Sequence, residues 1–544
     1  MFQQTDVSQS ISKFPEWPKL VLSAVLFSIL YTQAPLYYSN QNQYFLHGFE
    51  MAGQGSLSND WLAKTLDPTP IFSGMVAIIH QYFHEWFFHL ALGIILGTYV
   101  LCSWLIFKKH MGSMEKLAQS WWIYFGFLAV AHAAILRWLS FRILGNDYPW
   151  FFQAGVAGQY ILGGMLQPST FGVFLLLGIA LYYSEKPWLG TFFVCLGGIL
   201  HSTYLLAGAM IILGFQVDLL LRGCWKKAIY LGLFALALVM PSVIYVGSHF
   251  QPTDKQAFES AQEFLVQFRL PHHCLPKLWV DWVACLQILW VIFCCYLCRK
   301  NSLGIIMFTC VILSSALTLT QYFTNSNSLA LLFPWRISSI LVPLATLILI
   351  SKISASEKIT GRFYQWNIVS FSIVMVLAGF GICIMYLGWG YRVNNSENQL
   401  LAYIKANQQK SDQYLIPIQI PNLAKTTKGS LSSDFKPAVT KKADTRVVPI
   451  DMQRFRLVTL APLYIDFKSI PYQDGDVLEW HRRLLNCESW YNLINNNKVD
   501  EVLPFLKKEK ITHLVTTSKN PELPNPFKLL FKDENYLLWE IQNK

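Results

Sequence analysis

Apolar residues fall in long runs separated by short polar connections over residues 1–390 of the chain. A helix that crosses the hydrocarbon core of a bilayer, about 30 Å thick, needs roughly 20 such residues. The pattern predicts eleven membrane spans, at 18–38, 86–107, 119–140, 165–184, 187–201, 202–221, 228–248, 279–298, 303–322, 334–351 and 368–390. The apolar segment 70–83 is too short to span and predicts a helix at the membrane interface.

The pattern changes after residue 390, where shorter helical and extended segments alternate. Helices are predicted at 396–409, 476–487 and 499–509, and strands at 413–418, 455–460, 462–467 and 511–517, followed by a hairpin at 527–541. The Lys/Ser/Thr-rich stretch 422–446 predicts a flexible insertion. The fold class is therefore an α-helical polytopic membrane domain, 1–390, with a C-terminal external α/β domain, 391–544.

The distribution of charge supports this division. Charged residues make up 36 of the first 390 positions and 39 of the last 154. Soluble domains carry about 25% charged residues, a level that only the second part reaches. This contrast excludes a single soluble enzyme, a coiled coil and a disordered chain.

The formal net charge of +11 has an explanation in membrane topology. Alternate connections between the spans hold 14 Lys and Arg residues, against 7 in the other short connections. Basic residues accumulate on the cytoplasmic side of membrane proteins, so the C-terminal domain is expected outside the cytoplasm, in a bacterial inner membrane. The sequence has no zinc-finger, RNA-recognition or basic-zipper pattern, so membrane lipids are expected as partners and nucleic acid is not.

Polar residues gather in the external connections, notably 39–85, 141–168 and 249–278, so function is expected on that face. Within the second connection, the apolar stretch 151–166 precedes Gly-Gly and Gln-Pro pairs that favour a re-entrant segment over a span. Ionisable side chains near membrane depth are candidate functional groups: His201, Arg269, His272, His273 and Arg336. His201 could equally cap a turn, and Arg336 could reach phospholipid head groups. The adjacent histidines point apart on an extended segment, so no metal site is expected.

Three aspartates in these connections are candidate general bases: Asp60, Asp67 and Asp147. Each also has a structural interpretation, since Asp60 suits the N-terminus of a helix and the other two suit turns. The argument for function is collective, because carboxylates, histidines and arginines converge on one face of a chain with few charges.

This architecture resembles the glycosyltransferase-C superfamily of polytopic membrane proteins, in particular an uncharacterised, cyanobacterial-type bacterial branch. Several stretches resemble that branch: N-Q-N-Q-Y at 40–44, Q-P-S-T-F at 167–171, H-S-T-Y-L-L at 201–206, R-L-P-H-H at 269–273, P-W-R at 334–336, F-R-L-V-T at 455–459 and Y-I-D-F-K-S-I-P-Y at 464–472. The resemblance implies a sugar donor linked to a lipid phosphate and an acidic residue early in the first external loop. This chain has amides at 40–43 instead, so the nearest substitute is Asp60, with Asp67 and Asp147 as reserves.

The expected function is a membrane glycosyltransferase that moves a sugar from a polyprenyl-phosphate donor to an external glycan or lipid acceptor. Asp60 or Asp147 would deprotonate the acceptor, Arg269 and Arg336 would clamp the donor phosphate, and these four side chains would line one cavity. The histidines would hydrogen-bond the phosphate or sugar, and Asn42 and Gln167 would orient hydroxyls. The alternatives are a non-catalytic lipid- or glycan-binding or assembly protein of the same fold and, third, a transporter. The sequence identifies no cofactor.

Overall fold

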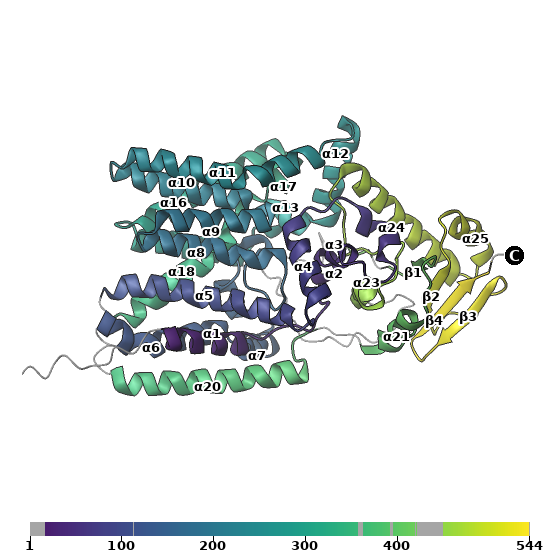
Figure 1. The fold of residues 1–544 in the computed structure, drawn as a ribbon, viewed down its shortest axis with the longest axis horizontal. Coiled ribbons are helices and arrows are strands. Elements are labelled where there is room, and N and C mark those ends of the chain that lie inside the picture. Colours follow the sequence, from purple (N-terminus) through teal and green to yellow (C-terminus); the bar gives the residue numbers. More distant parts are fainter. Residues whose placement is uncertain are drawn as a thin grey trace, which may run out of the picture.

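The computed structural model describes residues 17–112, 114–356, 363–391, 395–418, 420–421 and 450–542. Figure 1 shows a bundle of long helices whose axes follow the longest axis of the molecule, with a smaller α/β domain at one end. The predicted insertion 422–446 lies outside the described residues.

Every predicted span falls on an apolar helix or helix pair. These helices are α1 (Trp17–Tyr31), α5 (Phe87–Met111), α6 (Met114–His132) with α7 (Ala134–Leu144), α8 (Gly172–Tyr183), α9 (Pro187–Leu200), α10 (Leu205–Leu221), α11 (Trp225–His249), α15 (Trp282–Leu297), α16 (Ser302–Thr324), α18 (Ser338–Ser354) and α20 (Phe363–Leu387). Among the described residues, six helices are long and apolar enough to cross a membrane, or seven if the bent α6–α7 pair is one span. The chain is thus a helical protein of membrane type, and eleven crossings remain a prediction.

Small residues bring neighbouring helices into close contact. In the α8–α9 hairpin, a Cβ added at Gly178 would lie 2.6 Å from the carbonyl oxygen of Gly190 and 2.4 Å from Val194. Lipid gives helices no hydrophobic reason to associate, so van der Waals packing at such small residues has to hold them together. The two short helices therefore pack closely against each other.

The basic connections meet at one end of the bundle. Lys109 and Arg222 lie 3.6 and 3.7 Å from the carboxylate of Glu185, and Arg222 also donates a hydrogen bond to Ser302. These contacts join the α5–α6, α8–α9, α10–α11 and α15–α16 connections. The C-terminal domain lies at the opposite end (Figure 1), so the bundle separates a basic end from the end that carries the domain.

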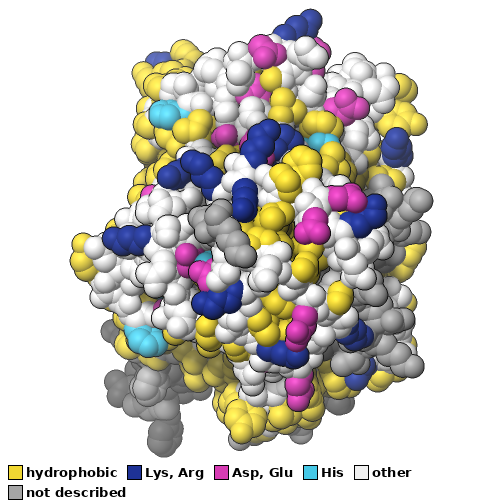
Figure 2. Space-filling model, turned by 90° about the vertical axis from the view of Figure 1, so that its right-hand side faces the viewer, with side chains coloured by type: hydrophobic (Ala, Val, Ile, Leu, Met, Phe, Trp, Pro, Cys, Tyr) yellow, Lys and Arg dark blue, Asp and Glu magenta, His cyan; other side chains and the backbone are white. Residues whose placement is uncertain are grey.

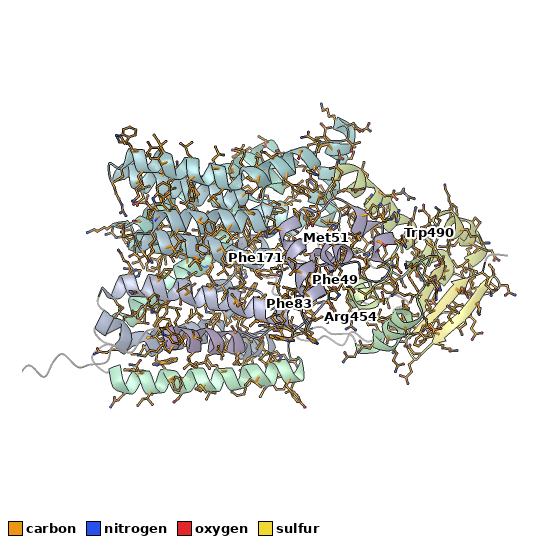
Figure 3. All side chains as sticks on the ribbon, viewed as in Figure 1. Phe49, Met51, Phe83, Phe171, Arg454 and Trp490 are labelled. Carbon is orange, nitrogen blue, oxygen red and sulfur yellow. The ribbon has the colours of Figure 1, made fainter. Side chains whose placement is uncertain are left out.

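The opposite connections are long and structured, and we call the region where they meet the C-terminal domain the junction. The first holds α2 (Gln41–Tyr44), α3 (Leu46–Met51), turns η1 (Leu57–Asn59) and η2 (Leu62–Lys64), and α4 (Pro70–Tyr82). The others hold turns η3 (Tyr148–Phe152), η4 (Val156–Gly158), η5 (Pro168–Phe171), η6 (Ser202–Tyr204) and η8 (Pro334–Ile337), helices α12 (Lys255–Glu263), α13 (Pro271–Cys274), α14 (Pro276–Trp279) and α17 (Asn327–Leu331), and the π-helical η7 (Phe264–Arg269). Figure 3 places Phe49 and Met51 of α3 between the helix ends and the C-terminal domain, with Phe171 nearer the bundle.

Two predictions for these connections can be compared with the structure. The apolar segment 70–83 is a helix, α4, and it exposes Ile71 and Ile78 as an interfacial helix would. The stretch 151–166 forms short turns in place of a long helix, and most of its side chains are buried against protein. Irregular backbone at this depth is tolerated because it packs against protein instead of lipid.

The C-terminal domain contains a four-stranded sheet packed against helices. Its elements are η9 (Asn395–Glu397), α21 (Asn398–Asn407), β1 (Tyr414–Leu415), η10 (Ile450–Arg454), α23 (Phe455–Thr459), α24 (Asp474–Asn495), α25 (Val499–Lys508), β2 (His513–Thr517), β3 (Phe527–Lys532) and β4 (Tyr536–Ile541). The sheet order is β1-β2-β4-β3; β1 pairs parallel to β2, and the other pairs are antiparallel, as the predicted hairpin requires. Figure 2 shows positive and negative side chains interspersed on the outer face of this domain, which is typical of a water-exposed surface.

The predicted strands at 455–460 and 462–467 are wrong. Residues Phe455–Thr459 form helix α23, which ends at Leu460 in the left-handed region (φ 61°). Of the second segment, Leu463 makes only an isolated bridge with Tyr414. Tertiary contacts override the local β pattern here, because this segment places Arg456 in ion pairs with Asp60 and Asp466, as described below.

Candidate functional site

Asp60 lies in a buried ion-pair network that ties the first junction loop to the C-terminal domain. Its Oδ2 accepts hydrogen bonds from Arg456 Nε at 2.6 Å and from the Leu463 amide at 2.8 Å, and its Oδ1 accepts two further amides. Arg456 also pairs with Asp466. Both carboxylate oxygens of Asp60 are thus engaged, which favours a structural role over the predicted role as a base.

Asp147 is engaged in a similar way. Its Oδ2 accepts from Arg137 Nε at 3.0 Å and lies 2.9 Å from Arg137 Nη2, while Oδ1 caps the turn η3 through the Trp150 amide at 3.2 Å. The guanidinium of Arg137 stacks on the Trp150 ring, 4.3 Å from its centroid. Both charged groups are buried, so this pair also holds the fold of the second junction loop.

Asp67 is the predicted carboxylate that keeps an unengaged oxygen. Its Oδ1 accepts a hydrogen bond from the Thr69 amide at 2.8 Å, whereas its Oδ2 is buried with no hydrogen-bond partner among the described residues. The side chain lines a pocket with Tyr44 and Tyr472, one from the membrane part and the other from the C-terminal domain. Asp67 is therefore the one of the three predicted carboxylates that the structure leaves with an oxygen not engaged by an arginine or an amide.

Tyr472 is influenced by the charges of both Asp67 and Arg269. Its hydroxyl accepts a hydrogen bond from Gln43 Nε2 at 2.6 Å. Burial first, and then the charges and hydrogen bond around it, raise the pKa of Tyr472 well above its ordinary value; Tyr44 and Asp67 act in that direction and Arg269 opposes them. Tyr472 therefore lies within electrostatic reach of both Asp67 and Arg269.

Arg269 ends the π-helical turn η7 and is buried beneath the C-terminal domain. Its Nη2 donates to the carbonyl oxygen of Lys468 at 2.8 Å, and its guanidinium lies 5.1 Å from the centroid of the Phe467 ring. Its Nε has no hydrogen-bond partner among the described residues, and burial lowers the pKa of the guanidinium. A buried cation with a free donor is a favourable place for an anionic group.

Arg336 and His201 form a second polar pair at the helix ends. Arg336 Nη2 lies 3.0 Å from His201 Nε2, and its guanidinium lies 4.8 Å from the Tyr204 ring centroid. Arg336 Nε and His201 Nδ1 are both buried without a partner among the described residues. The His201 ring packs 6.1 Å from that of Tyr44, which also lines the Asp67 pocket. This ring contact brings the pair into the same neighbourhood as Asp67.

His273 lies among the cations of this neighbourhood. Its Nδ1 donates to the Ala157 carbonyl at 2.5 Å, and it lines a pocket together with Arg336. Burial lowers the pKa of His273 to about 4, and the positive charges of Arg336, Arg269 and Lys468 add to this effect against the hydrogen bond. The imidazole is therefore neutral at pH 7, with Nε2 available as an acceptor. The neighbouring His272 packs its ring 4.0 Å away.

The two predicted amides have mixed roles. Asn42 donates to the carbonyls of Tyr37 and Ser39 at 2.8 and 3.1 Å and so shapes the start of the first junction loop. Gln167 donates to the Tyr160 hydroxyl at 3.1 Å. Each leaves its carbonyl oxygen buried without a partner among the described residues. No group of three or more His, Cys, Asp or Glu side chains suited to a metal ion occurs in the described part of the chain.

Arg336 pairs with His201 and shares a pocket with His273, whereas Asp67 lines a separate pocket. Asp67 is related to these groups only through the Tyr44 ring beside His201 and the charges around Tyr472, and Asp60 and Asp147 lie in ion pairs. Sequence reasoning missed Gln43, Tyr44 and Tyr472, which line the Asp67 pocket. Tyr472 ends the quoted stretch 464–472, so the signal was present, but nothing in the sequence indicated that this stretch reaches the membrane helices.

Comparison with known proteins adds one finding. A family model described as a domain of unknown function (DUF6798) matches residues 438–487, a segment that includes Arg456, Asp466, Lys468 and Tyr472. No curated protein matches the chain. Among the described residues of this segment, Arg456, Lys468 and Tyr472 make hydrogen bonds to the junction.

Proposed function

We propose that this protein is a membrane glycosyltransferase that moves a sugar from a polyprenyl-phosphate donor to an acceptor hydroxyl. The observation that carries the proposal is a set of buried polar atoms at the junction without a hydrogen-bond partner among the described residues: Nε of Arg269 and of Arg336, Nδ1 of His201 and Oδ2 of Asp67. The cations lie at the ends of apolar helices, where the phosphate of a lipid would lie when its chain is in the bilayer. The resemblance to the glycosyltransferase-C superfamily points in the same direction.

The chemistry requires a base on one side of the sugar and positive charge on the other. The acceptor oxygen attacks the anomeric carbon, its proton passes to the Asp67 carboxylate, and the bond from the anomeric carbon to the phosphate oxygen breaks. The bonding electrons leave with the polyprenyl phosphate, whose growing charge Arg269 and Arg336 stabilise. Donors fixed in a water-poor site are most effective at such a step.

The location is part of the proposal. The connections that carry most of the basic residues meet at the end of the bundle away from the C-terminal domain. By the positive-inside rule that end faces the cytoplasm, so the junction and the C-terminal domain face the outside of a bacterial inner membrane.

A second candidate function is a non-catalytic protein that binds a lipid phosphate or a glycan. The engagement of Asp60 and Asp147 in ion pairs favours it, because these pairs leave Asp67 alone among the three predicted carboxylates. The arginine cluster would serve either function. The role of Asp67 in turnover therefore separates the two.

The test compares lipid-linked sugars in cells with and without the protein, followed by variants. Loss of the protein is expected to cause a polyprenyl-phosphate sugar to accumulate. Arg269→Ala and Arg336→Ala are expected to reproduce the accumulation with normal membrane insertion, whereas Arg299→Ala, at the opposite end, retains activity. Asp67→Asn is expected to lower turnover by about 100-fold or more and to spare donor binding. Normal turnover by Asp67→Asn would leave the binding protein as the better proposal.

A further inference from the structure

Exposed Trp and Tyr side chains are confined to the ends of the apolar helices. Among the described side chains, each exposed Trp or Tyr lies at most five residues from such an end; the farthest is Tyr230, five positions after Trp225. We call the two sets that they form the basic-end belt and the junction-end belt. The basic-end belt is Trp17, Trp188, Trp225, Tyr230, Tyr296 and Trp366, and the junction-end belt is Tyr82, Trp86, Tyr148, Trp282, Tyr322, Tyr386 and Trp389.

The large apolar residues that are exposed between the belts are Val, Leu, Ile, Met and Phe. They include Ile368, Val376 and Ile382 on α20, and Leu286 and Leu289 on α15. A bilayer sorts residues in this way, because hydrocarbon suits purely apolar side chains and the head-group level suits the amphipathic rings of Trp and Tyr. A protein partner would cover one side of the bundle and would not sort residues by height. The surface between the belts therefore fits a lipid bilayer.

The two belts lie farther apart on α20 than on α15. On α20, which follows the whole bundle in Figure 1, Trp366 and Tyr386 are 20 residues apart, or about 30 Å of α-helix, which matches a hydrocarbon core. On α15, Trp282 and Tyr296 are 14 residues apart, or about 21 Å. A tilt of α15 would reduce this height further. The bilayer beside α15 is thus expected to be thinner than the bilayer beside α20.

Charged side chains mark both ends of α15. Asp281 precedes Trp282, and its Oδ1 accepts a hydrogen bond from the Ala284 amide at 2.8 Å, which caps the helix. At the other end, the Arg299 guanidinium lies 4.1 Å from the centroid of the Tyr296 ring. A charge is costly in hydrocarbon, so the hydrocarbon beside α15 ends near these two charged residues.

The missing height of α15 lies at its junction end. Since α15 ends at Leu297 and α16 begins at Ser302, the two helices start from one short turn at the basic end. From there α16 extends 20 residues to Tyr322, about 30 Å, whereas α15 extends about 21 Å to Trp282. The head groups on the junction side therefore have to come closer to the middle of the bundle at α15.

This end of α15 lies beside the pocket that Arg336 and His273 line. Ala284 of α15 packs in one apolar cluster with Ala157 and Trp279, and both of these residues also line the pocket. Lipid head groups at the end of α15 would thus lie next to this pocket.

We infer that the bilayer is pinched beside α15, where its head groups on the junction side lie about 9 Å deeper than they do beside α20. A bilayer accommodates such a mismatch by local thinning at modest cost. The pinch brings lipid phosphates toward the Arg336 pocket at a depth that is hydrocarbon elsewhere around the protein. Its use as the entry of the donor rests on the proposed function, whereas the position of the head groups does not.

The test places the full-length protein in vesicles of palmitoyl-oleoyl phosphatidylethanolamine and phosphatidylglycerol. The exposed thiols Cys224, Cys285 and Cys383 are replaced by Ala, and nitroxide spin labels are attached to single introduced cysteines. Collisions of each label with oxygen and with a polar nickel complex report its depth. Trp282→Cys and Phe380→Cys are a matched pair, because each position is exposed and lies 14 residues, about 21 Å, from the basic-end belt residue of its own helix.

The label at 282 is expected at head-group level, where the nickel complex reaches it, and the label at 380 about 9 Å deeper, where oxygen dominates. Leu286→Cys and Val376→Cys form a second pair that keeps Trp282, each 10 residues from the same belt, and the label at 286 is expected to be the shallower one. Tyr296→Cys and Trp366→Cys are controls, which are expected to report equal depths at the basic end.

Equal depths within both matched pairs overturn the pinch, because a bilayer of uniform thickness predicts them. Labels at 282 and 286 that neither oxygen nor nickel reaches also overturn it, because a second copy of the chain then covers α15. The experiment contains no donor, so its result is independent of turnover. A pinch in a protein that consumes no donor supports the inference and removes only its link to transfer, whereas uniform thickness with normal turnover leaves the proposed function standing without the pinch.

Discussion

The ion-pair network of Asp60, Arg456 and Asp466 gives the sharpest prediction about stability. All three side chains are buried, and Arg456 is the only cation among them. Burial alone would lower the pKa of Arg456, but the two carboxylates reverse this and raise it, so the guanidinium stays charged. Replacing Arg456 with Met keeps most of the side-chain volume and leaves two buried carboxylates without a counter-ion.

The expected cost follows from that geometry. Removing one partner from a buried ion pair costs about 3–5 kcal/mol, because a desolvated charge remains. In a domain of this size, 1 kcal/mol corresponds to about 2–4 °C in Tm, so Arg456→Met is expected to lower the Tm of the C-terminal domain by roughly 10 °C. Because Asp60 belongs to the first junction loop, trypsin is also expected to cut that loop faster in the variant.

Arg482→Met provides the matched control. Arg482 pairs with Glu479 and Glu509 but is 45% exposed, and an exposed pair contributes about 0–1 kcal/mol. A second variant tests the cause: adding Asp60→Asn and Asp466→Asn to Arg456→Met removes all three charges and is expected to recover part of the loss. Equal Tm values for Arg456→Met and Arg482→Met would refute the reasoning, and so would a triple variant less stable than Arg456→Met.

Three further predictions concern charge and topology. Asp147→Asn is expected to lower stability by about 3 kcal/mol, because Arg137 would lose its buried counter-ion, and chemical denaturation would measure this against an exposed control such as Asp500→Asn. Because the pKa of His273 in the folded protein is about 4 and its ordinary value is 6.5, the unfolded chain binds a proton between these values that the folded protein does not. The free energy of unfolding is therefore expected to fall as the pH drops through this window, by at most about 3 kcal/mol. The fall is expected to be smaller in His273→Asn, whose amide can still donate a hydrogen bond to Ala157. Parallel pH profiles of stability for the two proteins would contradict this. A reporter active only in the cytoplasm and fused after Asn395 is expected to be silent, and strong activity would reverse the proposed orientation.

Much of the membrane part could be predicted from the sequence, since each predicted span lies on an apolar helix or helix pair. In lipid a backbone has to satisfy its own hydrogen bonds, so a long apolar run has few alternatives to a helix. The C-terminal helices and the hairpin were also predictable from local patterns. The conformation of segment 455–467 could not be predicted from local patterns, because it depends on contacts with a loop far away in the sequence. Arg456, for example, pairs with Asp60, 396 positions earlier.

For the candidate site, too, one part could be predicted from the sequence and another part could not. The sequence determined which side chains are available at one end of the bundle, because few charges occur there and the connections alternate between the two ends. Only the tertiary structure decided which of them remain unengaged. Asp60 and Asp147 form ion pairs with arginines, whereas Oδ2 of Asp67 has no hydrogen-bond partner among the described residues. The physical reason is that an ion pair or hydrogen bond depends on a separation of about 3 Å between atoms, and spacing along the chain does not determine that separation.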